Sequence, residues 1–355
     1  MIRYKNSDTL QQLLLASGTI DDSVIQQLQT LHSDEEIWPL LRDCLWYNPL
    51  AKLSPTLRAS ILSLGPTLGR NDFYLSLLQA QEAAKSVAAE SINIYVAAMP
   101  KSGSSFLAGA LCSALDIPFH NLTTSHPQPS NVEMNGREQE IDELALLKKV
   151  LDGAGFVAQH HTKSTVYMMK LLSSYNVGTI VTFRNIFDGM ISYDEMLRSK
   201  KLNDPSNQGA LKIPVNYSEL SLGDRIEVIS SNYAIWCIDF YLSWKRVEQA
   251  GFKFFWVDYD QYLSRSSGDK SKFCEALISF LTPNPVQEEK IYDVIVGEKV
   301  PMSTSRFRRG VSGDGVDKVP VEIKRRLIKY AEKYNKELEL SDMKVIFGHH
   351  YEDIS

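Results

Sequence analysis

A short apolar run followed at once by a lysine, small residues and a helical pattern is the feature that most constrains this chain. Residues 94–98 are apolar and predict a buried strand, after which the chain reads Met99-Pro-Lys-Ser-Gly-Ser-Ser105. Apolar side chains at helical spacing follow over residues 106–115. The first N–H groups of such a helix have no partners inside it, and its dipole favours negative charge there. The pattern therefore predicts a strand, an anion-binding loop and a helix.

This loop offers several groups suited to a phosphate or a sulfate. Lys101 supplies a point charge, Gly103 lets an anion approach the backbone, and three hydroxyls are candidate donors, those of Ser102, Ser104 and Ser105. In the Walker A loop the lysine directly follows the second glycine, whereas Lys101 precedes Gly103. This order favours a phosphate binder that works without metal. A metal-dependent nucleotide phosphotransferase stays open as an alternative.

Composition narrows the class of protein. The 355 residues suffice for one large α/β domain, alone or with a small appendage. A net charge of −5 argues against nucleic-acid binding, which needs a basic surface. The 4 cysteines form no Cys-x-x-Cys pair, which favours free thiols in a reducing compartment. Since the sequence has neither a membrane-spanning run of roughly 18 apolar residues nor a signal-peptide core, we expect a cytoplasmic protein without membrane contact.

The pattern of the chain changes near residue 90. Residues 1–90 show short helical segments without strand signals, which predicts an all-helical N-terminal region. That region is interpreted as a packing cap or as a surface for a protein partner. Residues 91–355 alternate between strands and helices, which predicts a P-loop-like α/β domain with a parallel sheet flanked by helices.

Ionisable residues follow two further predicted strands. Residues 156–161 predict a buried strand that ends at His161, and residues 179–183 predict another that runs into Arg184. Ligands of parallel sheets bind at the carboxyl ends of the strands. We therefore expect Lys101, His161 and Arg184 to converge on one edge of the sheet.

Three segments stand out for their motifs, at residues 100–106, 183–193 and 307–314. They resemble motifs of the cytosolic sulfotransferases, which use 3′-phosphoadenosine 5′-phosphosulfate (PAPS). Pro100-Lys-Ser-Gly-Ser-Ser-Phe106 is similar to the family loop Pro-Lys-Ser-Gly-Thr-Thr-Trp, which binds the 5′-phosphosulfate. Phe183-Arg-Asn-Ile-Phe-Asp-Gly-Met-Ile-Ser-Tyr193 resembles the segment Arg-Asn-Pro-x-Asp-x-x-x-Ser-Tyr, which holds the 3′-phosphate. Phe307-Arg-Arg-Gly-Val-Ser-Gly-Asp314 resembles Arg-Lys-Gly-x-x-Gly-Asp-Trp, which contacts the same phosphate. The resemblance covers roughly residues 92–317.

This resemblance implies a sulfotransferase with PAPS as donor, 3′-phosphoadenosine 5′-phosphate (PAP) as product, no metal and a small-molecule acceptor. The residues it assigns to the 5′ end are Lys101, Ser102, Gly103, Ser104, Ser105 and Phe106. Those it assigns to the 3′-phosphate are Arg184, Ser192, Arg308, Arg309 and Gly310, with Tyr259 near the adenine. A non-catalytic nucleotide-binding scaffold, with the N-terminal helices docking a partner, is the second alternative.

The catalytic base is also implied by the resemblance. The family histidine stands at the end of the strand after the loop helix, in Lys-Thr-His, where this chain has Gln159-His-His161. His161 is therefore the candidate base, with Lys101 stabilising the departing charge, and His160 is the alternative. A neutral imidazole titrates near enough to pH 7 to take a proton from a hydroxyl or an amine. Polysaccharide sulfotransferases of the same fold use a glutamate in the first helix, and residues 106–115 contain none.

Some positions depart from the family pattern. Gln159 stands where the family has a lysine, Phe106 where it has an adenine-stacking tryptophan, and Gly315 where it has the last tryptophan. We expect the acceptor pocket under residues 118–136 and 200–225. Its expected lining residues are Phe119, His126 and His160.

Overall fold

The structure, a computed structural model, describes residues 19–20, 26, 52–55, 59, 73–123, 140–198, 213–259, 267–296, 314–334, 340–348 and 351. The chain divides into two units. The first comprises Met1–Ser91 with Leu147–Gly153 and Ser173–Asn176, and the second comprises the other residues. The division at residues 90 and 91 stays a prediction.

Within residues 1–91 of the first unit, the structure describes one long helix and a pair of very short strands. Helix α5 (Phe73–Ala88) buries Ala84 and Ala88 completely. Strands β1 (Thr19–Ile20) and β2 (Lys52–Leu53) pair in parallel. The prediction of an all-helical N-terminal region is wrong for this strand pair. Strands of two residues are too short to leave an alternating pattern in the sequence.

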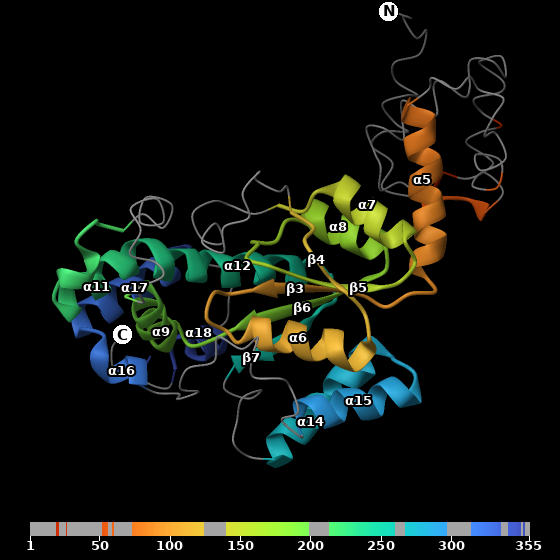
Figure 1. Cartoon of the computed structure of the whole chain (residues 1–355). Coiled ribbons are helices and arrows are strands. Elements are labelled where there is room, and N and C mark those ends of the chain that lie inside the picture. The colour runs from red at the N-terminus through yellow and green to blue at the C-terminus, as the bar shows by residue number, and fades with distance from the viewer. Residues whose placement is uncertain are drawn as a thin grey trace, which may run out of the picture. The chain divides into compact units, whose positions relative to one another are not determined.

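A five-stranded sheet runs through the second unit (Figure 1). In spatial order its strands are β4 (Phe119–His120), β5 (Phe156–His160), β3 (Asn93–Ala98), β6 (Val177–Phe183) and β7 (Phe255–Asp258). Each neighbouring pair is parallel. The prediction of an α/β fold with a parallel sheet flanked by helices is confirmed.

Strand β4 lies inside residues 118–136, the first of the two segments under which the acceptor pocket is expected. It pairs Phe119 with Val157 and His120 with Ala158 of β5. A strand of two residues carries no periodicity that a sequence pattern could reveal. The rest of this segment, residues 124–136, lies outside the described residues, and His126 with it.

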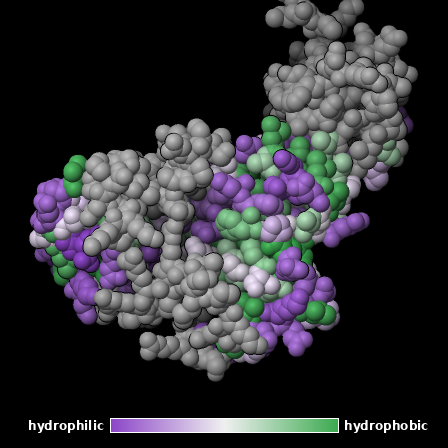
Figure 2. Space-filling model, in the orientation of Figure 1, coloured by the Kyte–Doolittle hydropathy of each residue, from purple (hydrophilic) through white to green (hydrophobic). Residues whose placement is uncertain are grey.

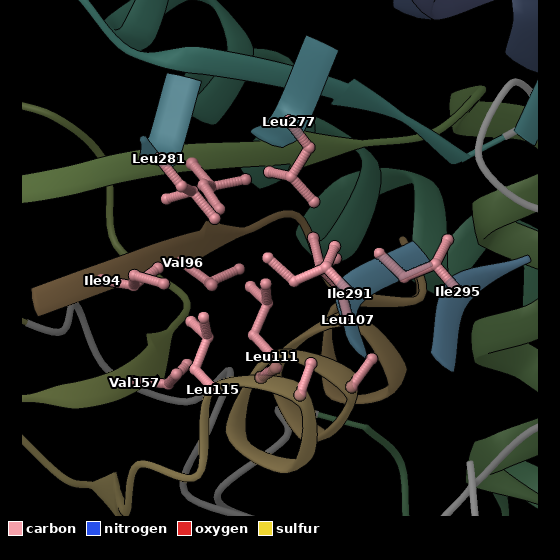
Figure 3. Packing of buried hydrophobic residues seen from close by; sticks show 14 of the residues in the cluster. Ile94, Val96, Leu107, Leu111, Leu115, Val157, Leu277, Leu281, Ile291 and Ile295 are labelled. Atoms are coloured by element: carbon pink, nitrogen blue, oxygen red, sulfur yellow. The ribbon is translucent and has the colours of Figure 1, made fainter. Parts of the chain in front are cut away.

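Three helices cover one face of the sheet: α6 (Ser104–Leu115), α14 (Ser267–Leu281) and α15 (Pro285–Ile295) (Figure 1). Their apolar side chains meet those of β3 in a buried cluster (Figure 3). The labelled members include Ile94, Val96, Leu107, Leu111, Leu115, Leu277, Leu281, Ile291 and Ile295. Burying each such side chain contributes roughly 1.5–3 kcal/mol. This packing fixes the strand and the helix that flank the lysine loop.

The opposite face carries α12 (Ile235–Gln249). The sequence predicts one long helix over residues 226–250. The structure instead continues α11 (Leu222–Ile229) through a π-helical turn, η5 (Ser230–Ala234), into α12. A π-turn widens one turn without interrupting the helix. Its apolar spacing therefore still reads as a single helix in the sequence.

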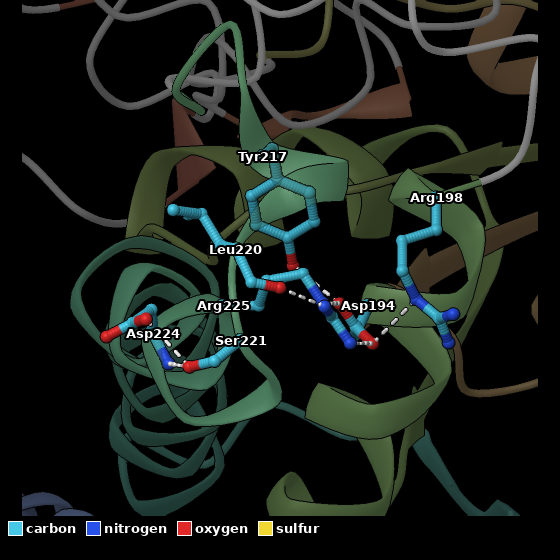
Figure 4. A network of polar contacts seen from close by, with 7 residues as sticks. All are labelled: Asp194, Arg198, Tyr217, Leu220, Ser221, Asp224 and Arg225. Carbon is cyan, nitrogen blue, oxygen red and sulfur yellow. Dashed lines mark hydrogen bonds and ion pairs between the residues drawn. The ribbon is translucent and has the colours of Figure 1, made fainter.

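A buried carboxylate on α9 (Ile186–Leu197) joins this helix to α11 and η4 (Tyr217–Glu219) (Figure 4). Asp194 is 1% exposed. Its Oδ1 accepts hydrogen bonds from Arg225 Nε at 2.8 Å and from Tyr217 Oη at 2.9 Å. Its Oδ2 accepts from Arg198 Nε at 3.0 Å. A buried charge paired in this way anchors α9, because removing one partner of a buried pair costs about 3–5 kcal/mol.

The described C-terminal helices are α16 (Asp314–Lys318), α17 (Val321–Tyr334) and α18 (Leu340–Phe347). α17 buries Ile323, Leu327 and Ile328 at helical spacing and exposes Arg325 and Arg326 between them. Hydrophilic residues predominate around α11 and α16 on the visible face in Figure 2. Two further helices, α7 (Glu143–Leu151) and α8 (Val166–Ser174), flank β5 in the chain.

Candidate functional site

Four neighbouring strands end at one edge of the sheet, and each is followed by a predicted site residue. β5 leads into His161, β3 into the lysine loop, β6 into Arg184 and β7 into Tyr259. The register sets these ends side by side, through the pairs Ala97 with His160, Ala98 with Thr182, and Phe183 with Asp258. The structure thus brings Lys101, His161 and Arg184 to one edge.

The lysine loop has an unusual backbone. Lys101 and Gly103 both have left-handed φ angles, 71° and 74°. For a residue other than glycine this region costs roughly 1–2 kcal/mol. Helix α6 begins directly afterwards without a side-chain cap, and Phe106 N–H donates to the Gly103 carbonyl at 3.0 Å. The amides at the start of α6 therefore form the kind of site that binds anions.

The hydroxyl of Ser102 makes its hydrogen bonds within the protein. Ser102 is 1% exposed, and its Oγ donates to the Met99 carbonyl at 2.6 Å. Since a hydroxyl has one hydrogen, the second bond, 2.6 Å from Thr182 Oγ1, is donated by the threonine. Met99 N–H also donates to the Thr182 carbonyl at 2.9 Å. These bonds shape the loop and tie it to β6.

The other residues predicted for the 5′ end lie in the first turn of α6. Ser104 is buried, whereas Ser105 is exposed and its Oγ lies 3.4 Å from Gln159 Oε1 on β5. Phe106 is half-buried and packs against the core cluster. Gln159 therefore faces the start of α6. It stands where the sulfotransferase motif that this chain resembles has a lysine.

His161 makes a short contact with the end of β3. Its Nδ1 lies 2.6 Å from the Ala98 carbonyl oxygen, and the residue is 4% exposed. A carbonyl can only accept, so Nδ1 carries the proton and Nε2 carries the lone pair. The ring meets Trp236 of α12 edge to face, at a centroid distance of 6.5 Å. His161 is thus held in the tautomer that can take up a proton at Nε2.

His160 has a different environment. Its Nε2 accepts the backbone N–H of Leu122 at 3.0 Å, and its ring stacks on Tyr95. Burial, together with the proximity of His161, lowers the pKa of His160 to about 3. His160 therefore stays neutral with Nε2 occupied, which makes it a poor candidate for proton transfer through that atom.

The chain after His161 is fixed against α12 and β3. Thr162 Oγ1 lies 2.6 Å from Tyr95 Oη, and Trp244 Nε1 donates to the Thr162 carbonyl at 3.1 Å. Ser164 N–H donates to Ser243 Oγ at 3.0 Å. These bonds restrict the orientation of the His161 backbone.

Arg184 is 6% exposed and stacks on an aromatic ring. Its guanidinium carbon lies 4.0 Å from the centroid of Tyr259, and its Nη2 lies 4.0 Å from Asp188 Oδ2. Asn185, the N-cap of α9, accepts from Phe187 N and Asp188 N. The positive charge is thus positioned by a ring on one side and by a carboxylate one helical turn away. Such an arrangement suits binding of a phosphate group.

Gly315 brings the C-terminal part of the chain onto this arginine segment. Its N–H donates to Asp188 Oδ1 at 2.6 Å. A Cβ at this position would collide with the backbone of Phe187 and Asp188. The motif that this segment resembles has a tryptophan here, and the same collision would exclude that side chain. The close approach explains the glycine and anchors residue 315 beside the start of α9.

Other predicted site residues are not brought to this edge by any described contact. Ser192 is half-buried on α9, and Phe119 on β4 is 53% exposed. Arg308, Arg309 and Gly310 lie outside the described residues.

Sequence reasoning missed the side chains that connect the parts of the site. Tyr233 of η5 donates to the Pro100 carbonyl at 2.8 Å, and Trp236 contacts His161. Thr182 holds Ser102, and Asp188 lies between Arg184 and Gly315. Gly315, a small residue in place of a large one, was the one sequence signal of such a contact.

Metal ligands and membrane spans were also sought in the part of the chain that the structure describes. There, no group of three His, Cys, Asp or Glu side chains is placed to hold a metal ion. Within the same residues, no helix combines the length and the apolar character needed to cross a membrane.

Comparison with known proteins found no family model and no curated protein that matches this chain. Among solved structures, the mouse sulfotransferase SULT7A1 complexed with PAP is similar, with a TM-score of 0.47 and 15% identity over 74% of this chain and 91% of that one. The sulfotransferase STF9 from Mycobacterium avium is similar with a TM-score of 0.41 and 11% identity, over 80% of this chain and 91% of that one.

Proposed function

We propose that this protein is a PAPS-dependent sulfotransferase that acts on a hydroxyl or an amine of a small-molecule acceptor. The observation that carries the proposal is the His161–Ala98 contact of 2.6 Å at the end of β3, the strand that leads into the lysine loop. A candidate base and a candidate anion site thus share one strand end. The sequence resemblance supplies the reaction class, and this geometry is compatible with it.

The proton step belongs to His161. Its Nδ1–H is held by the Ala98 carbonyl, so Nε2 carries the lone pair that would accept the proton of an attacking hydroxyl or amine. A positioned base of this kind contributes typically 10²–10⁴-fold to the rate. His160 is a weaker candidate, because its Nε2 already accepts the Leu122 N–H.

The donor-binding groups fit a ligand with anions at two places. The amides at the start of α6 and Lys101 suit the 5′ end, and the stacked Arg184 suits the 3′-phosphate. When bound, PAPS would supply the sulfuryl group. Lys101 would stabilise the negative charge that develops on the departing oxygen. Ser192, with the Arg308–Gly310 segment, is proposed to complete the 3′-phosphate site.

Nucleotide binding is the first test. Thermal stability should be measured with PAP and, separately, with ATP and Mg²⁺. We expect PAP to raise the melting temperature, because a ligand that binds only the folded state stabilises it. Stabilisation by ATP with Mg²⁺ and none by PAP would instead support a metal-dependent phosphotransferase.

Transfer is the second test. Labelled sulfate from PAPS should be followed over phenols, alcohols, amines and sugars as acceptors. We expect product with at least one class. PAP binding without transfer to any acceptor would point to a nucleotide-binding scaffold.

The cytoplasmic location and the absence of nucleic-acid and membrane partners also remain proposals, as does a protein partner for the N-terminal region.

A further inference from the structure

Tyr233 contacts both the lysine loop and helix α9. Its Oη donates to the Pro100 carbonyl at 2.8 Å, directly before Lys101. Its ring stacks on Tyr193 of α9, with 4.4 Å between centroids and an interplanar angle of 20°. Tyr193 directly follows Ser192. One side chain therefore connects the lysine loop to the helix that begins after Arg184.

The hydrogen bond to Pro100 orients the peptide that leads into Lys101. In a trans peptide the carbonyl and the following N–H point in opposite directions. Since this peptide is trans and its carbonyl points toward Tyr233, the Lys101 N–H points away from the tyrosine. Lys101 has a left-handed φ of 71°, a conformation that persists only where the surroundings hold it. The tyrosine hydroxyl is one such support.

Gly189 of α9 provides the room for this hydroxyl. A Cβ at position 189 would collide with Tyr233 Oη, whereas it would lie 3.4 Å from Cζ of the same ring. Of the nearest atoms, the hydroxyl oxygen is therefore the one that leaves no room for a Cβ at position 189. Complete burial raises the pKa of Tyr233 well above its ordinary value, so the hydroxyl stays protonated and able to donate.

We propose that Tyr233 is a positioning residue that sets the spacing between the lysine loop and α9. The inference rests on the proposed function, because it concerns the same donor site. Without the hydroxyl, the Pro100–Lys101 peptide can turn, and the loop amides lose their alignment with Arg184. A ligand with anions at both places would then fit less well.

Replacing Tyr233 by Phe removes the hydrogen bond and keeps the ring stack. We expect the dissociation constant for PAP to rise about tenfold, since a buried hydrogen bond is worth roughly 1 kcal/mol or slightly more. Adenosine 3′-phosphate has no 5′-phosphate to contact the lysine loop, so its affinity should fall much less. Tyr217→Phe is the matched control, because it removes another buried hydroxyl that bonds Asp194 at 2.9 Å. Equal losses for PAP in both variants would overturn the proposal.

A double-mutant cycle with Gly189→Ala tests the contact from the other side. In the parent protein the new Cβ displaces the Tyr233 hydroxyl, so PAP binding should weaken about as much as in Tyr233→Phe. In the Tyr233→Phe background the clash is gone, and Gly189→Ala should add no further loss. Losses that simply add would contradict a shared mechanism.

Hydrogen exchange separates this proposal from the proposed function, because it needs no nucleotide. The amides of residues 101–105 should exchange faster in Tyr233→Phe and in Gly189→Ala than in the parent protein or in Tyr217→Phe. If the parent protein does not bind PAP, the proposed function fails while this measurement still stands. Unchanged exchange in the loop would overturn the positioning role whatever the nucleotide result.

Discussion

The imidazole Nδ1 of His161 lies 2.6 Å from the carbonyl oxygen of Ala98. Ala98 is the last residue of β3, and its neighbour Ala97 pairs with His160 in the sheet register. The tautomer of the candidate base is therefore set by a backbone group of the adjacent strand. The same strand end starts the lysine loop, so the orientation of the base and that of the anion site depend on one piece of backbone.

Replacing His161 by Asn should remove the base while an amide N–H can still bond the Ala98 carbonyl. We expect the kcat for sulfate transfer to fall by roughly 10²–10⁴-fold. PAP affinity and thermal stability should change little, because the side chain is not expected to contact the nucleotide. Steady-state kinetics with labelled PAPS measure the change in kcat. His160→Gln, which can still accept the Leu122 N–H, is the control that should keep most of the rate. A fully active His161→Asn protein would place the base elsewhere.

His160 should make the free energy of unfolding fall as the pH becomes acidic. Its pKa in the folded state is about 3, against an ordinary value of 6.5. Between these values the unfolded chain binds a proton that the folded protein does not, so stability is complete above about pH 6.5 and falls as the pH drops toward 3. The slope from this group is at most about 1.4 kcal/mol per pH unit. Urea unfolding across this range should show a shallower slope in His160→Gln. Identical slopes would mean that His160 does not lose its proton on folding.

Ser102 and Thr182 should act on stability as a pair. Ser102→Ala leaves the Thr182 hydroxyl and the Met99 carbonyl without this partner, which should cost about 1–3 kcal/mol of unfolding free energy. Once Thr182→Val is present, the same change should cost less, because the threonine hydroxyl is no longer there to be stranded. Denaturant unfolding of the two single variants and the double variant gives the coupling. Additive costs would show that the two hydroxyls are energetically independent.

Tyr259 should contribute to PAP binding through its aromatic ring rather than through its hydroxyl. The Arg184 guanidinium lies 4.0 Å from the ring centroid, and such a contact is worth about 0.5–2 kcal/mol. Tyr259→Leu should therefore weaken PAP binding by a few-fold to about thirtyfold, and Tyr259→Phe should keep most of the affinity. Calorimetry with PAP and with adenosine 5′-phosphate tests the assignment. A similar loss for both nucleotides would mean that Tyr259 acts through the part of the ligand that they share and not through Arg184 and the 3′-phosphate.

The sequence pattern predicted the strand–loop–helix unit closely. The strand expected over residues 94–98 is Asn93–Ala98, and the helix expected from residue 106 is Ser104–Leu115. Both have a continuous apolar face that packs into one cluster, so local pattern and tertiary packing favour the same elements. The arrival of His161 and Arg184 at the same edge followed from the parallel order of the strands.

The supporting contacts could not be predicted, because they join residues far apart in the chain. Tyr233 and Pro100 are 133 residues apart, and Gly315 and Asp188 are 127 apart. No local spacing rule reaches that distance. The difference between His160 and His161 likewise depends on Leu122, whose N–H comes from the connection before β5. Only the folded arrangement shows which of two adjacent histidines is already occupied.

The π-helical turn η5 makes the site sensitive to chain length as well as to residue identity. Tyr233 lies within this turn and Trp236 lies just beyond it, and one reaches Pro100 while the other reaches His161. Deleting a single residue here would convert the wide turn into a regular α-helical turn and would shift Tyr233 around the helix relative to Trp236. The two side chains could not then both keep their partners. A deletion in this turn would therefore disturb the support of both the loop and the base, even with every motif residue retained.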